Sequence, residues 1–412
     1  MIRLNNKSVV FVILFLTTSV LAFAQKLNLN QTLEKAIQNN YAIKAAELFY
    51  ESARLEEKTI IAFPKTNVNA LIGQTNSIRF DENISIVQDI RNPASVKAEK
   101  MVASVRGNLV KQEAEINKRE ILFNIQRNWY ECLYYLNLKK ILSYEDSILT
   151  AFVKVADLKH RSGEGKLLEK NIAETKKQQL QQLMLQNEMN VNLSKLKIQQ
   201  EIGLNADFEF VDTLTLLDYK SLTDSILFES HPMIQYIRNQ INLSEAEAKN
   251  AKMEMLPDFS GGYFIQSLSG PQDVNGQTRS FNSVPVFQGV SIGINVPVFN
   301  LKAYKTKQEM FLIEKAANEK LAENALWNLN QKMNQNITTY NFLKQHLKFY
   351  NSSAIPNSEM IIKNASKSYQ NGEIEYVEYL QALQSGIEIK KNHLHTINLV
   401  NQSVIELWYL TN

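Results

Sequence analysis

The sequence predicts a mainly helical protein in which long α-helical hairpins are combined with four short β-strands. Helix-breaking residues are sparse, because none of the 8 prolines falls between residues 93 and 232, and proline is the residue that disfavours a helix interior most. Four short segments instead alternate apolar and polar residues with a period of two, which is typical of strands that have one apolar face. Helices and strands follow one another in an order that occurs twice along the chain.

Residues 1–24 are predicted to be a cleavable secretory signal. Two early cations precede a mostly apolar run from Val9 to Leu21, and an A-x-A sequence ends at Ala24, as at a signal cleavage site. The apolar run is shorter than the roughly 20 residues that a membrane-spanning helix needs. We therefore expect the mature chain to begin at Gln25, outside the cytoplasm. No later apolar run approaches that length, so any membrane span is expected to be β.

The central part of the chain is predicted to form very long helices. Lys97 to His160 would extend roughly 95 Å at the helical rise of about 1.5 Å per residue. An apolar stripe at steps of four and three residues marks this segment, which is typical of coiled-coil-like packing. The stripe comprises Ile121, Ile125, Trp129, Cys132 and Leu136. Cys132 is the only cysteine, which excludes an intrachain disulfide and a thiolate metal cluster, and we expect it to be a small buried residue.

The four strand-like segments raise the question of what their apolar faces contact. In the last of them, Val290, Ile292, Ile294 and Val296 alternate with Ser291, Gly293 and Asn295. Each segment has about nine to eleven residues, the length of a tilted membrane-spanning strand. A soluble four-stranded sheet packed on a helix would give the same pattern. The predicted secretory signal and the lack of an evident core partner favour the membrane.

Three landmarks recur in the same order about 200 residues apart, which indicates a duplicated unit. AFPKTNVNALIG around Pro64 matches MLPDFSGGYFIQ around Pro257, ISIVQDI matches VSIGINV, and HRSGEG matches YQNGEI. We predict a first repeat over residues 25–203, a linking segment over 204–224 and a second repeat over 225–412. The second repeat has extra residues between its two strands, and Pro356 is expected to interrupt its long helix.

Membrane strands would require several copies of the chain. Open sheet edges are not tolerated in lipid, and four strands are too few to close a barrel. Several copies would then build one barrel together. In that barrel Val290, Ile292, Ile294 and Val296 would face lipid, and Ser291, Gly293 and Asn295 would face a water-filled lumen.

The remaining composition points away from other functions. The net charge of +3 comes without the clustered Lys and Arg of a nucleic-acid-binding surface. The five histidines are scattered, and no H-E-x-x-H, G-x-S-x-G or P-loop sequence occurs. We expect no catalytic residues, no metal site and no cofactor, and therefore no enzyme.

The repeated plan of a strand pair followed by a helix hairpin resembles the TolC-like outer-membrane efflux family, over about residues 27–410. The sequences that carry the resemblance are LNLNQTLEKAIQNNYAIKAA, ESHPMIQYIRNQINLSEAEAKNAKMEMLPDFSGGYF, ADLKHRSGEGKLLE and SKSYQNGEIEYVEYLQAL. The resemblance implies a homotrimer whose twelve strands form one outer-membrane β-barrel, continued by a periplasmic α-barrel. The segment 204–224 would then belong to a belt around the middle of the α-barrel.

The resemblance also implies a periplasmic tip formed by the turns at Gly163 and Gly372, where an adaptor protein docks. The tip residues implied in this way are Gly163, Glu164, Gly165, Glu169, Gly372, Glu373, Glu378 and Gln381. Family members carry two inward acidic residues after the second turn. Glu378 falls at the first of those positions but Gln381 takes the second, so the acidic ring is reduced, and each glutamate here can equally be part of a solvated helix face.

The second half looks most similar to outer-membrane partners of heavy-metal pumps of the resistance–nodulation–division class. LPDFSGGYFIQSLSG, GEIEYVEYLQALQSG and NQSVIELWYLTN carry that likeness. The function it implies is a passive exit duct, which receives heavy-metal cations from an inner-membrane pump through a periplasmic adaptor. Two alternatives remain open: a soluble periplasmic coiled-coil adaptor or scaffold, and a duct for organic drugs or secreted proteins.

Overall fold

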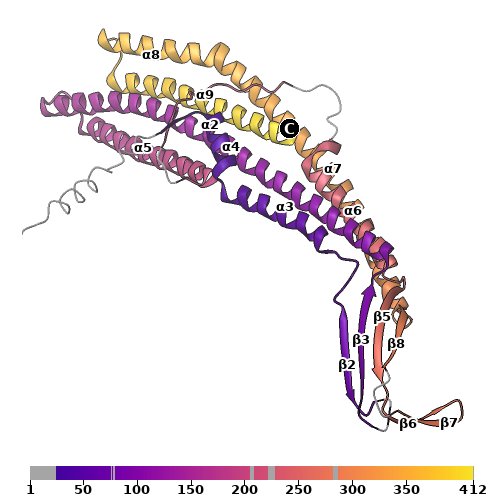
Figure 1. Ribbon diagram of the computed structural model, residues 1–412. Helices are drawn as coiled ribbons and strands as arrows, with labels where there is room; N and C mark the ends of the chain where they lie inside the picture. Colours follow the sequence, from indigo (N-terminus) through magenta and orange to yellow (C-terminus); the bar gives the residue numbers. More distant parts are fainter. Residues whose placement is uncertain are drawn as a thin grey trace, which may run out of the picture. The chain divides into compact units, whose positions relative to one another are not determined.

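The computed structural model describes residues 25–75, 77, 79–204, 208–220, 228–281 and 286–411 (Figure 1). The predicted signal segment 1–24 lies outside the described residues, as do 205–207 and 221–227 of the linking segment. The chain divides into two compact units. The strand unit comprises residues 45–117 and 227–330, and the helical unit comprises 1–44, 118–226 and 331–412.

The strand unit contains the four predicted strands in one antiparallel sheet, in the order β2-β3-β5-β8. Their bounds are β2 Asn67–Gly73, β3 Asp81–Ile90, β5 Asp258–Ser267 and β8 Val286–Asn295. The central pairing of β3 with β5 joins the first half of the chain to the second. The sequence-based prediction of these four strands is therefore confirmed.

The same unit contains parts of four helices that lie side by side in the order of the strands. They are α3 (Tyr41–Thr59), α4 (Pro93–Arg161), α6 (Pro232–Met253) and α7 (Leu301–Phe349). The order is fixed by contacts across each neighbouring pair. Arg106 of α4 pairs with Glu56 of α3 at 3.0 Å, the Ser95 hydroxyl of α4 donates to the Met253 carbonyl of α6, and Lys307 of α7 pairs with Glu254 of α6 at 2.8 Å.

The extra residues between the strands of the second half form a small hairpin, β6 (Gly270–Val274) and β7 (Gln277–Phe281). Asn275 and Gly276 at its turn have φ of 56° and 75°. Positive φ at both central residues is the signature of a type I′ turn, which Asn-Gly favours.

The helical unit contains the remaining parts of α4 and α7, together with α2 (Leu29–Asn39), α5 (Leu167–Ile202), α8 (Ile355–Gln370) and α9 (Tyr376–Thr411). Two three-residue strands, β1 (Gln25–Leu27) and β4 (Phe208–Phe210), pair in parallel. A 3-10 turn, η1 (Phe228–Ser230), belongs to the strand unit and precedes α6. Pro356 lies at the start of α8, directly after a π-helical turn, η2 (Tyr350–Ala354). Because proline has no N–H to donate, regular α-helical hydrogen bonding is interrupted between the end of α7 and the start of α8, as the sequence predicts.

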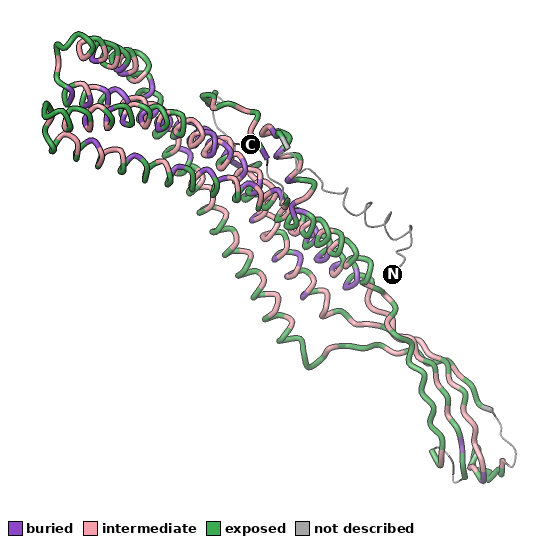
Figure 2. Tube along the Cα trace, turned by 90° about the vertical axis from the view of Figure 1, so that its left-hand side faces the viewer, coloured by how far each residue is buried: buried purple, intermediate pink, exposed green. Residues whose placement is uncertain are grey.

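The core of the helical unit lies where α2, α4, α5 and the β1–β4 pair meet. Trp129 is only 1% exposed, and its ring lies 4.4 Å from that of Phe210. Cys132 is buried, as predicted from the apolar stripe, and burial raises the pKa of its thiol to about 12. Along α5 buried residues recur as single positions three, four or seven residues apart (Figure 2), the pattern of a helix packed by a single stripe, whereas α9 also contains consecutive buried residues such as Ser403, Val404 and Ile405.

Candidate functional site

The register of the sheet places most of its apolar residues on one face. Val290 lies opposite Tyr263, and Tyr263 lies opposite Ile86, and directly opposite residues of antiparallel strands project to the same side. We call this side the apolar face. Its apolar members are Val68, Ala70, Ile72, Ile84, Ile86, Ile90, Phe259, Tyr263, Ile265, Val290, Ile292 and Ile294.

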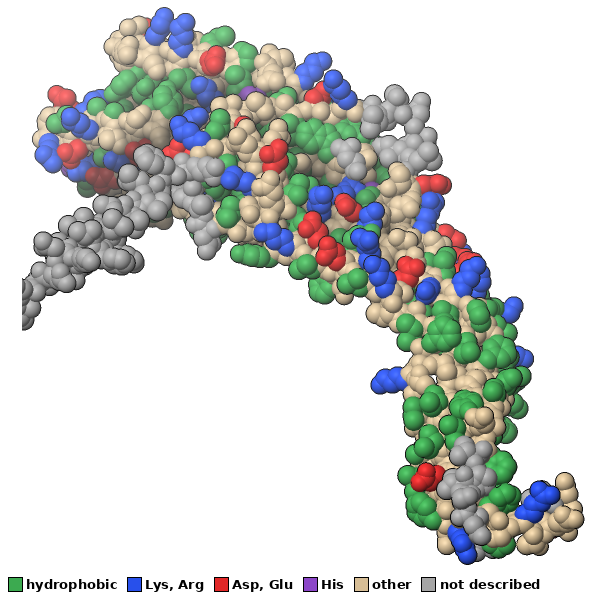
Figure 3. Space-filling model, viewed as in Figure 1, with side chains coloured by type: hydrophobic (Ala, Val, Ile, Leu, Met, Phe, Trp, Pro, Cys, Tyr) green, Lys and Arg blue, Asp and Glu red, His purple; other side chains and the backbone are tan. Residues whose placement is uncertain are grey.

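The apolar face is not buried within the chain. Val290, Ile292 and Ile294 are 74%, 85% and 63% exposed. Hydrophobic side chains cover much of the sheet in the view of Figure 3, and charged side chains are few there. Monomeric soluble proteins rarely expose a contiguous apolar surface of this extent, so such a face marks a contact with lipid or with another chain.

The opposite side, which we call the polar face, is lined mostly by small and polar residues, with Leu71, Val87, Phe264 and Phe287 as its large apolar members. Ser291 and Gly293 project there, opposite Gly262 and Ser260. A Cβ on Gly262 would lie 2.5 Å from the Ser291 hydroxyl, so the hydroxyl lies directly over the glycine. Phe264, which breaks the polar alternation, lies with its ring against Gly289, where an added Cβ would be 2.7 Å away.

The fourth residue predicted on the apolar side of the last strand lies just beyond it. β8 ends at Asn295, and Val296 follows as an exposed residue without strand pairing. Pro297 comes next, and because proline cannot donate a ladder hydrogen bond, the strand ends before it.

The two helical turns predicted at Gly163 and Gly372 have the same backbone geometry. Gly163 has φ of 79° and Gly372 has φ of 76°, the left-handed region that glycine enters most easily. After α4, the Gly163 and Glu164 amides donate to the His160 and Lys159 carbonyls. After α8, the Gly372 and Glu373 amides donate to Tyr369 and Ser368 in the same way. Both turns are thus Schellman motifs, at equivalent places in the two halves.

The acidic residues near these turns have separate local roles. The Glu378 carboxylate accepts a hydrogen bond from the Glu375 amide at 3.1 Å, which satisfies a free N–H at the start of α9. A hydrogen bond from Asn371 lowers the pKa of Glu373. Glu164, Glu373, Glu378 and Gln381 are exposed, whereas Gly165 and Glu169 are half-buried.

Tyr376 brings the two turns together. It is buried in a cluster with Phe152 and Ala173, from α4 and α5, and its ring stacks on that of Phe152. Burial, followed by the nearby Tyr369 and Glu169, raises the pKa of the Tyr376 hydroxyl. The first turn of α9 therefore packs against the hairpin formed by α4 and α5.

Sequence reasoning missed the apolar side chains that are exposed beside these turns. Leu167, Leu168 and Val377 are all exposed and lie in the first turns of α5 and α9. The signal that could have revealed them is the Leu-Leu pair directly after G-E-G-K, because a solvated helix start seldom carries two exposed leucines.

The described part of the chain lacks a membrane-spanning helix and a cluster of metal-ligating side chains. None of its helices is both long and apolar enough to cross a membrane. Among the same residues, no group of three His, Cys, Asp or Glu side chains is placed to hold a metal ion.

Comparison with solved structures identifies the fold. VceC, an outer-membrane protein of Vibrio cholerae, is similar with a TM-score of 0.75 and 14% identity, over 93% of this chain and 96% of that one. The CmeC outer-membrane channel of Campylobacter jejuni gives a TM-score of 0.76 and 11% identity, over 93% and 85%. CusC, studied for transmembrane channel formation, gives 0.76 and 13%, over 95% and 93%. No protein-family model and no curated protein sequence matches the chain.

The chain therefore has the fold of the TolC-like outer-membrane channels. The match covers nearly the whole chain and includes both the long helices and the four-stranded sheet. This confirms, at the level of fold, the resemblance that the sequence indicates.

Proposed function

We propose that this protein is the outer-membrane exit duct of a tripartite efflux system, and that it is not an enzyme. The observation that carries the proposal is the four-stranded sheet, whose apolar face remains exposed in the folded chain. In this proposal Val290, Ile292, Ile294 and Val296 contact lipid, and Ser291, Gly293 and Asn295 line a wet lumen.

The free edges of the sheet support an assembly of several copies. Among the residues that the structure describes, β2 and β8 each pair with one neighbour only, and their outer N–H and C=O groups would be unpaired in lipid at a cost of several kcal/mol each. Pairing of β8 in one copy with β2 in the next satisfies both edges. Three copies give twelve strands, within the range of known membrane barrels, and the resemblance to the family favours this number.

The two edge helices of the strand unit support the same assembly. α3 exposes Leu48 and Leu55, two helical turns apart. α7 exposes Met310, Ile313 and Leu321 at steps of three and eight residues, which place them on one face of the helix. Apolar stripes on both outer helices fit a closed ring, in which α7 of one copy packs against α3 of the next.

The adaptor is proposed to dock at the two helical turns. The residues involved are Gly163, Glu164, Gly165, Glu169, Gly372, Glu373, Glu378 and Gln381, joined by the exposed Leu167, Leu168 and Val377. The fully buried core of a protein–protein contact is more apolar than the rest of the surface, so these exposed apolar side chains suit the centre of such a contact. Export would then be passive in this protein: the inner-membrane pump supplies the energy, and the duct provides a wet route through the outer membrane.

The cargo is proposed to be heavy-metal cations, handed over by a pump of the resistance–nodulation–division class. This part rests on the resemblance of the second half of the sequence. The described strands are compatible with cations, because β2, β3, β5 and β8 contain no lysine or arginine.

A deletion strain tests the function. We expect it to become more sensitive to toxic metal cations such as cobalt, zinc, copper or silver, and the intact gene to restore resistance. Sensitivity only to organic toxins would support the exit-duct function but would show that the cargo is organic and not a metal cation. Unchanged sensitivity to both panels, with normal intracellular accumulation, would argue against an efflux role.

A further inference from the structure

We propose that a pocket between α3, α4 and α6 binds an anionic phospholipid from the periplasmic leaflet of the outer membrane. The inference rests on the proposed function, because it needs the sheet to lie in the membrane and the helices to begin at its periplasmic surface. It adds a lipid site to a chain otherwise considered as a duct.

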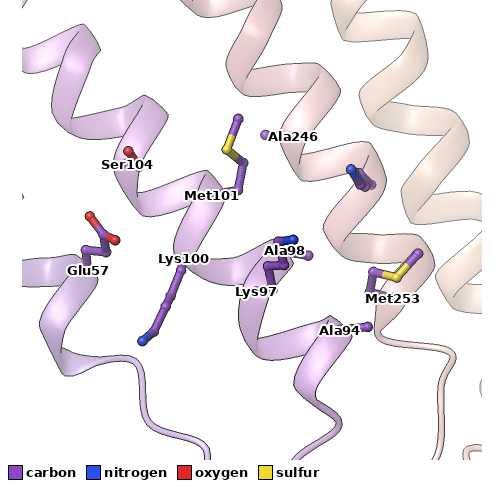
Figure 4. Close-up of a pocket in the computed structure, with 10 residues that line it drawn as sticks. Glu57, Ala94, Lys97, Ala98, Lys100, Met101, Ser104, Ala246 and Met253 are labelled. Atoms are coloured by element: carbon purple, nitrogen blue, oxygen red, sulfur yellow. The ribbon is translucent and has the colours of Figure 1, made fainter.

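The pocket is a hollow of about 490 Å³ with an apolar floor. Ala94, Ala98 and Met101 of α4 and Ala246 and Met253 of α6 form the floor (Figure 4). Methionine and alanine side chains can accommodate a flexible hydrocarbon chain without a fixed shape. The floor therefore suits the upper part of an acyl chain.

Three lysines surround this floor. Lys97, Lys100 and Lys249 line the pocket and are exposed, and within the described residues none of them forms an ion pair. The one carboxylate on the rim is Glu57 of α3. The pocket thus presents three cations against one anion.

The other carboxylates nearby are already paired with different cations. Glu99 pairs with Arg91, Glu247 with Arg106 and Glu254 with Lys307, while Glu245, the acidic neighbour of Lys249, binds Lys315 at 2.8 Å. Because these acids are engaged, the positive charge of the pocket is left for a ligand.

A second pocket shows which side of the helix layer the lysines occupy. It measures about 310 Å³ and is lined by residues of all four helices, including Glu56 of α3 and Lys307 of α7. A hollow that reaches both outer helices of a layer lies on the concave side. The α4 residues that line this second pocket are Glu99, Val102 and Arg106. They project from α4 on the side opposite to the residues that line the lysine pocket.

Helical geometry makes this opposition explicit. Lys97, Met101 and Ser104 share one face of α4 at steps of four and three residues. Glu99 and Arg106 fall about half a turn away from them. The concave side would be the lumen of the proposed tube, so the lysine pocket opens on its outer surface, where lipid is present.

The end of the pocket nearest the sheet, with Lys97 and Lys249, lies at the depth of lipid headgroups, and Lys100 lies about 10 Å along α4 from Pro93, just beyond it. β3 ends at Ile90 and α4 begins at Pro93, whereas α6 ends at Met253 and β5 begins at Asp258. Lys97 lies about 6 Å along the helix from Pro93. The headgroup region extends roughly 5–8 Å beyond the hydrocarbon, which places the Lys97 ammonium beside lipid phosphates.

These features together select the ligand. A zwitterionic lipid would gain little from three lysines, and a free phosphate would leave the apolar floor uncovered. A lipid with a net negative headgroup uses both, because its phosphate meets the cations while its acyl chain covers Ala94 and Met253, the floor residues nearest the sheet. Phosphatidylglycerol is a suitable probe of this class.

The experiment uses the full mature protein purified as a membrane assembly. Native mass spectrometry would count lipids retained from micelles that contain equal amounts of phosphatidylglycerol and phosphatidylcholine. We expect phosphatidylglycerol to be retained preferentially, about one molecule per chain. Each lysine near an anionic surface contributes about a fivefold preference for an anionic lipid. The preference for phosphatidylglycerol should therefore fall roughly a hundredfold in the triple variant Lys97→Gln, Lys100→Gln, Lys249→Gln.

Two further variants sharpen the test. The matched control is Lys65→Gln, Lys302→Gln, Lys305→Gln, which removes three exposed lysines at other strand–helix junctions and should retain the lipid. Glu57→Gln removes the anion on the rim and should raise retention several-fold. Glycerol 3-phosphate, which has the phosphate without acyl chains, should not compete.

The outcomes separate this site from the proposed function. A chain that forms no membrane assembly would overturn the proposed function and the lipid site with it. Normal assembly with equal retention of both lipids, or equal loss in the triple variant and its control, would overturn the lipid site alone. Competition by glycerol 3-phosphate would replace the lipid with a soluble phosphate ligand and would also overturn it.

Discussion

A charge placed on the apolar face should prevent membrane assembly to an extent that depends on its depth in the strand. Ile292 is the most exposed residue of that face in β8, at 85%, and lies opposite Gly261, so no neighbouring side chain shields it. Replacing it by lysine would place an ammonium group directly in hydrocarbon. The strand itself should tolerate the change, because the Ile292 side chain is not part of a packed core.

The magnitude follows from the position of the residue in the strand. β8 ends at Asn295, and a strand rises about 3.4 Å per residue at a tilt near 40°, or about 2.6 Å of depth per residue. From the end of the strand, Ile294 lies about 3 Å deep, Ile292 about 8 Å and Val290 about 13 Å, in an apolar band about 25 Å tall.

Lysine costs about 2–4 kcal/mol at the midplane of the bilayer and about 0–1 kcal/mol near its surface. Ile292→Lys should therefore cost about 1–3 kcal/mol per chain, multiplied by the three chains of the proposed barrel. Val290→Lys should cost more and Ile294→Lys less. This increase in cost from Ile294 to Val290 is expected for a strand in a membrane and is not expected for a strand in a soluble sheet.

The assay measures the yield of assembled protein in purified outer membranes. Ser291→Lys is the matched control, because it introduces the same charge one residue away on the polar face. We expect a low yield for Ile292→Lys and a near-normal yield for Ser291→Lys. Equal yields of Val290→Lys, Ile292→Lys and Ile294→Lys at the level of the unchanged protein would refute the assignment of the apolar face to lipid.

Three other changes test separate parts of the structure. Gly372→Val forces a β-branched residue into positive φ, at a cost of about 1–2 kcal/mol, and should abolish export while the barrel still assembles, as measured by resistance and outer-membrane yield. Asn401→Ala removes the buried amide that bridges the Leu217 N–H and the Thr215 carbonyl and should lower the free energy of unfolding by about 2–4 kcal/mol, measured by thermal unfolding. Because burial raises the pKa of Cys132 to about 12 and only the thiolate reacts, a maleimide at pH 8 should label it only after denaturation.

The two substitutions have matched controls. Gly372→Asn, which tolerates the left-handed conformation, should keep export, and full resistance in the valine variant would refute the role of the turn. Asn330→Ala, at an exposed helical position, should leave unfolding unchanged, and an equal effect of both alanine variants would contradict the bridging role. Complete labelling of native Cys132 would contradict its burial.

Local sequence patterns were sufficient to predict those features whose structure is determined by one or a few neighbouring residues. The glycines of H-R-S-G-E-G and Y-Q-N-G-E-I predicted both helix reversals, because a Schellman turn favours glycine in the left-handed region. The alternation around Ile292 predicted a strand with one apolar face. In each case the signal lies within a few consecutive residues.

Features formed by distant segments could not be predicted in this way. The pairing of β1 with β4 joins Gln25 to Phe208, and strands of three residues have no measurable periodicity. Phe264 breaks the polar alternation of β5, and the residue that its ring contacts, Gly289, lies on another strand. Lys97 and Lys249 form one pocket only because α4 packs against α6, which no local pattern reports.

The mass of the protein extracted from outer membranes in detergent tests the central claim most directly. Light scattering that separates protein from bound detergent gives the number of chains in each particle. A membrane-extracted particle of three mature chains is the result that the proposed duct predicts. A single chain recovered from the soluble periplasmic fraction, with none in the membrane, would contradict it.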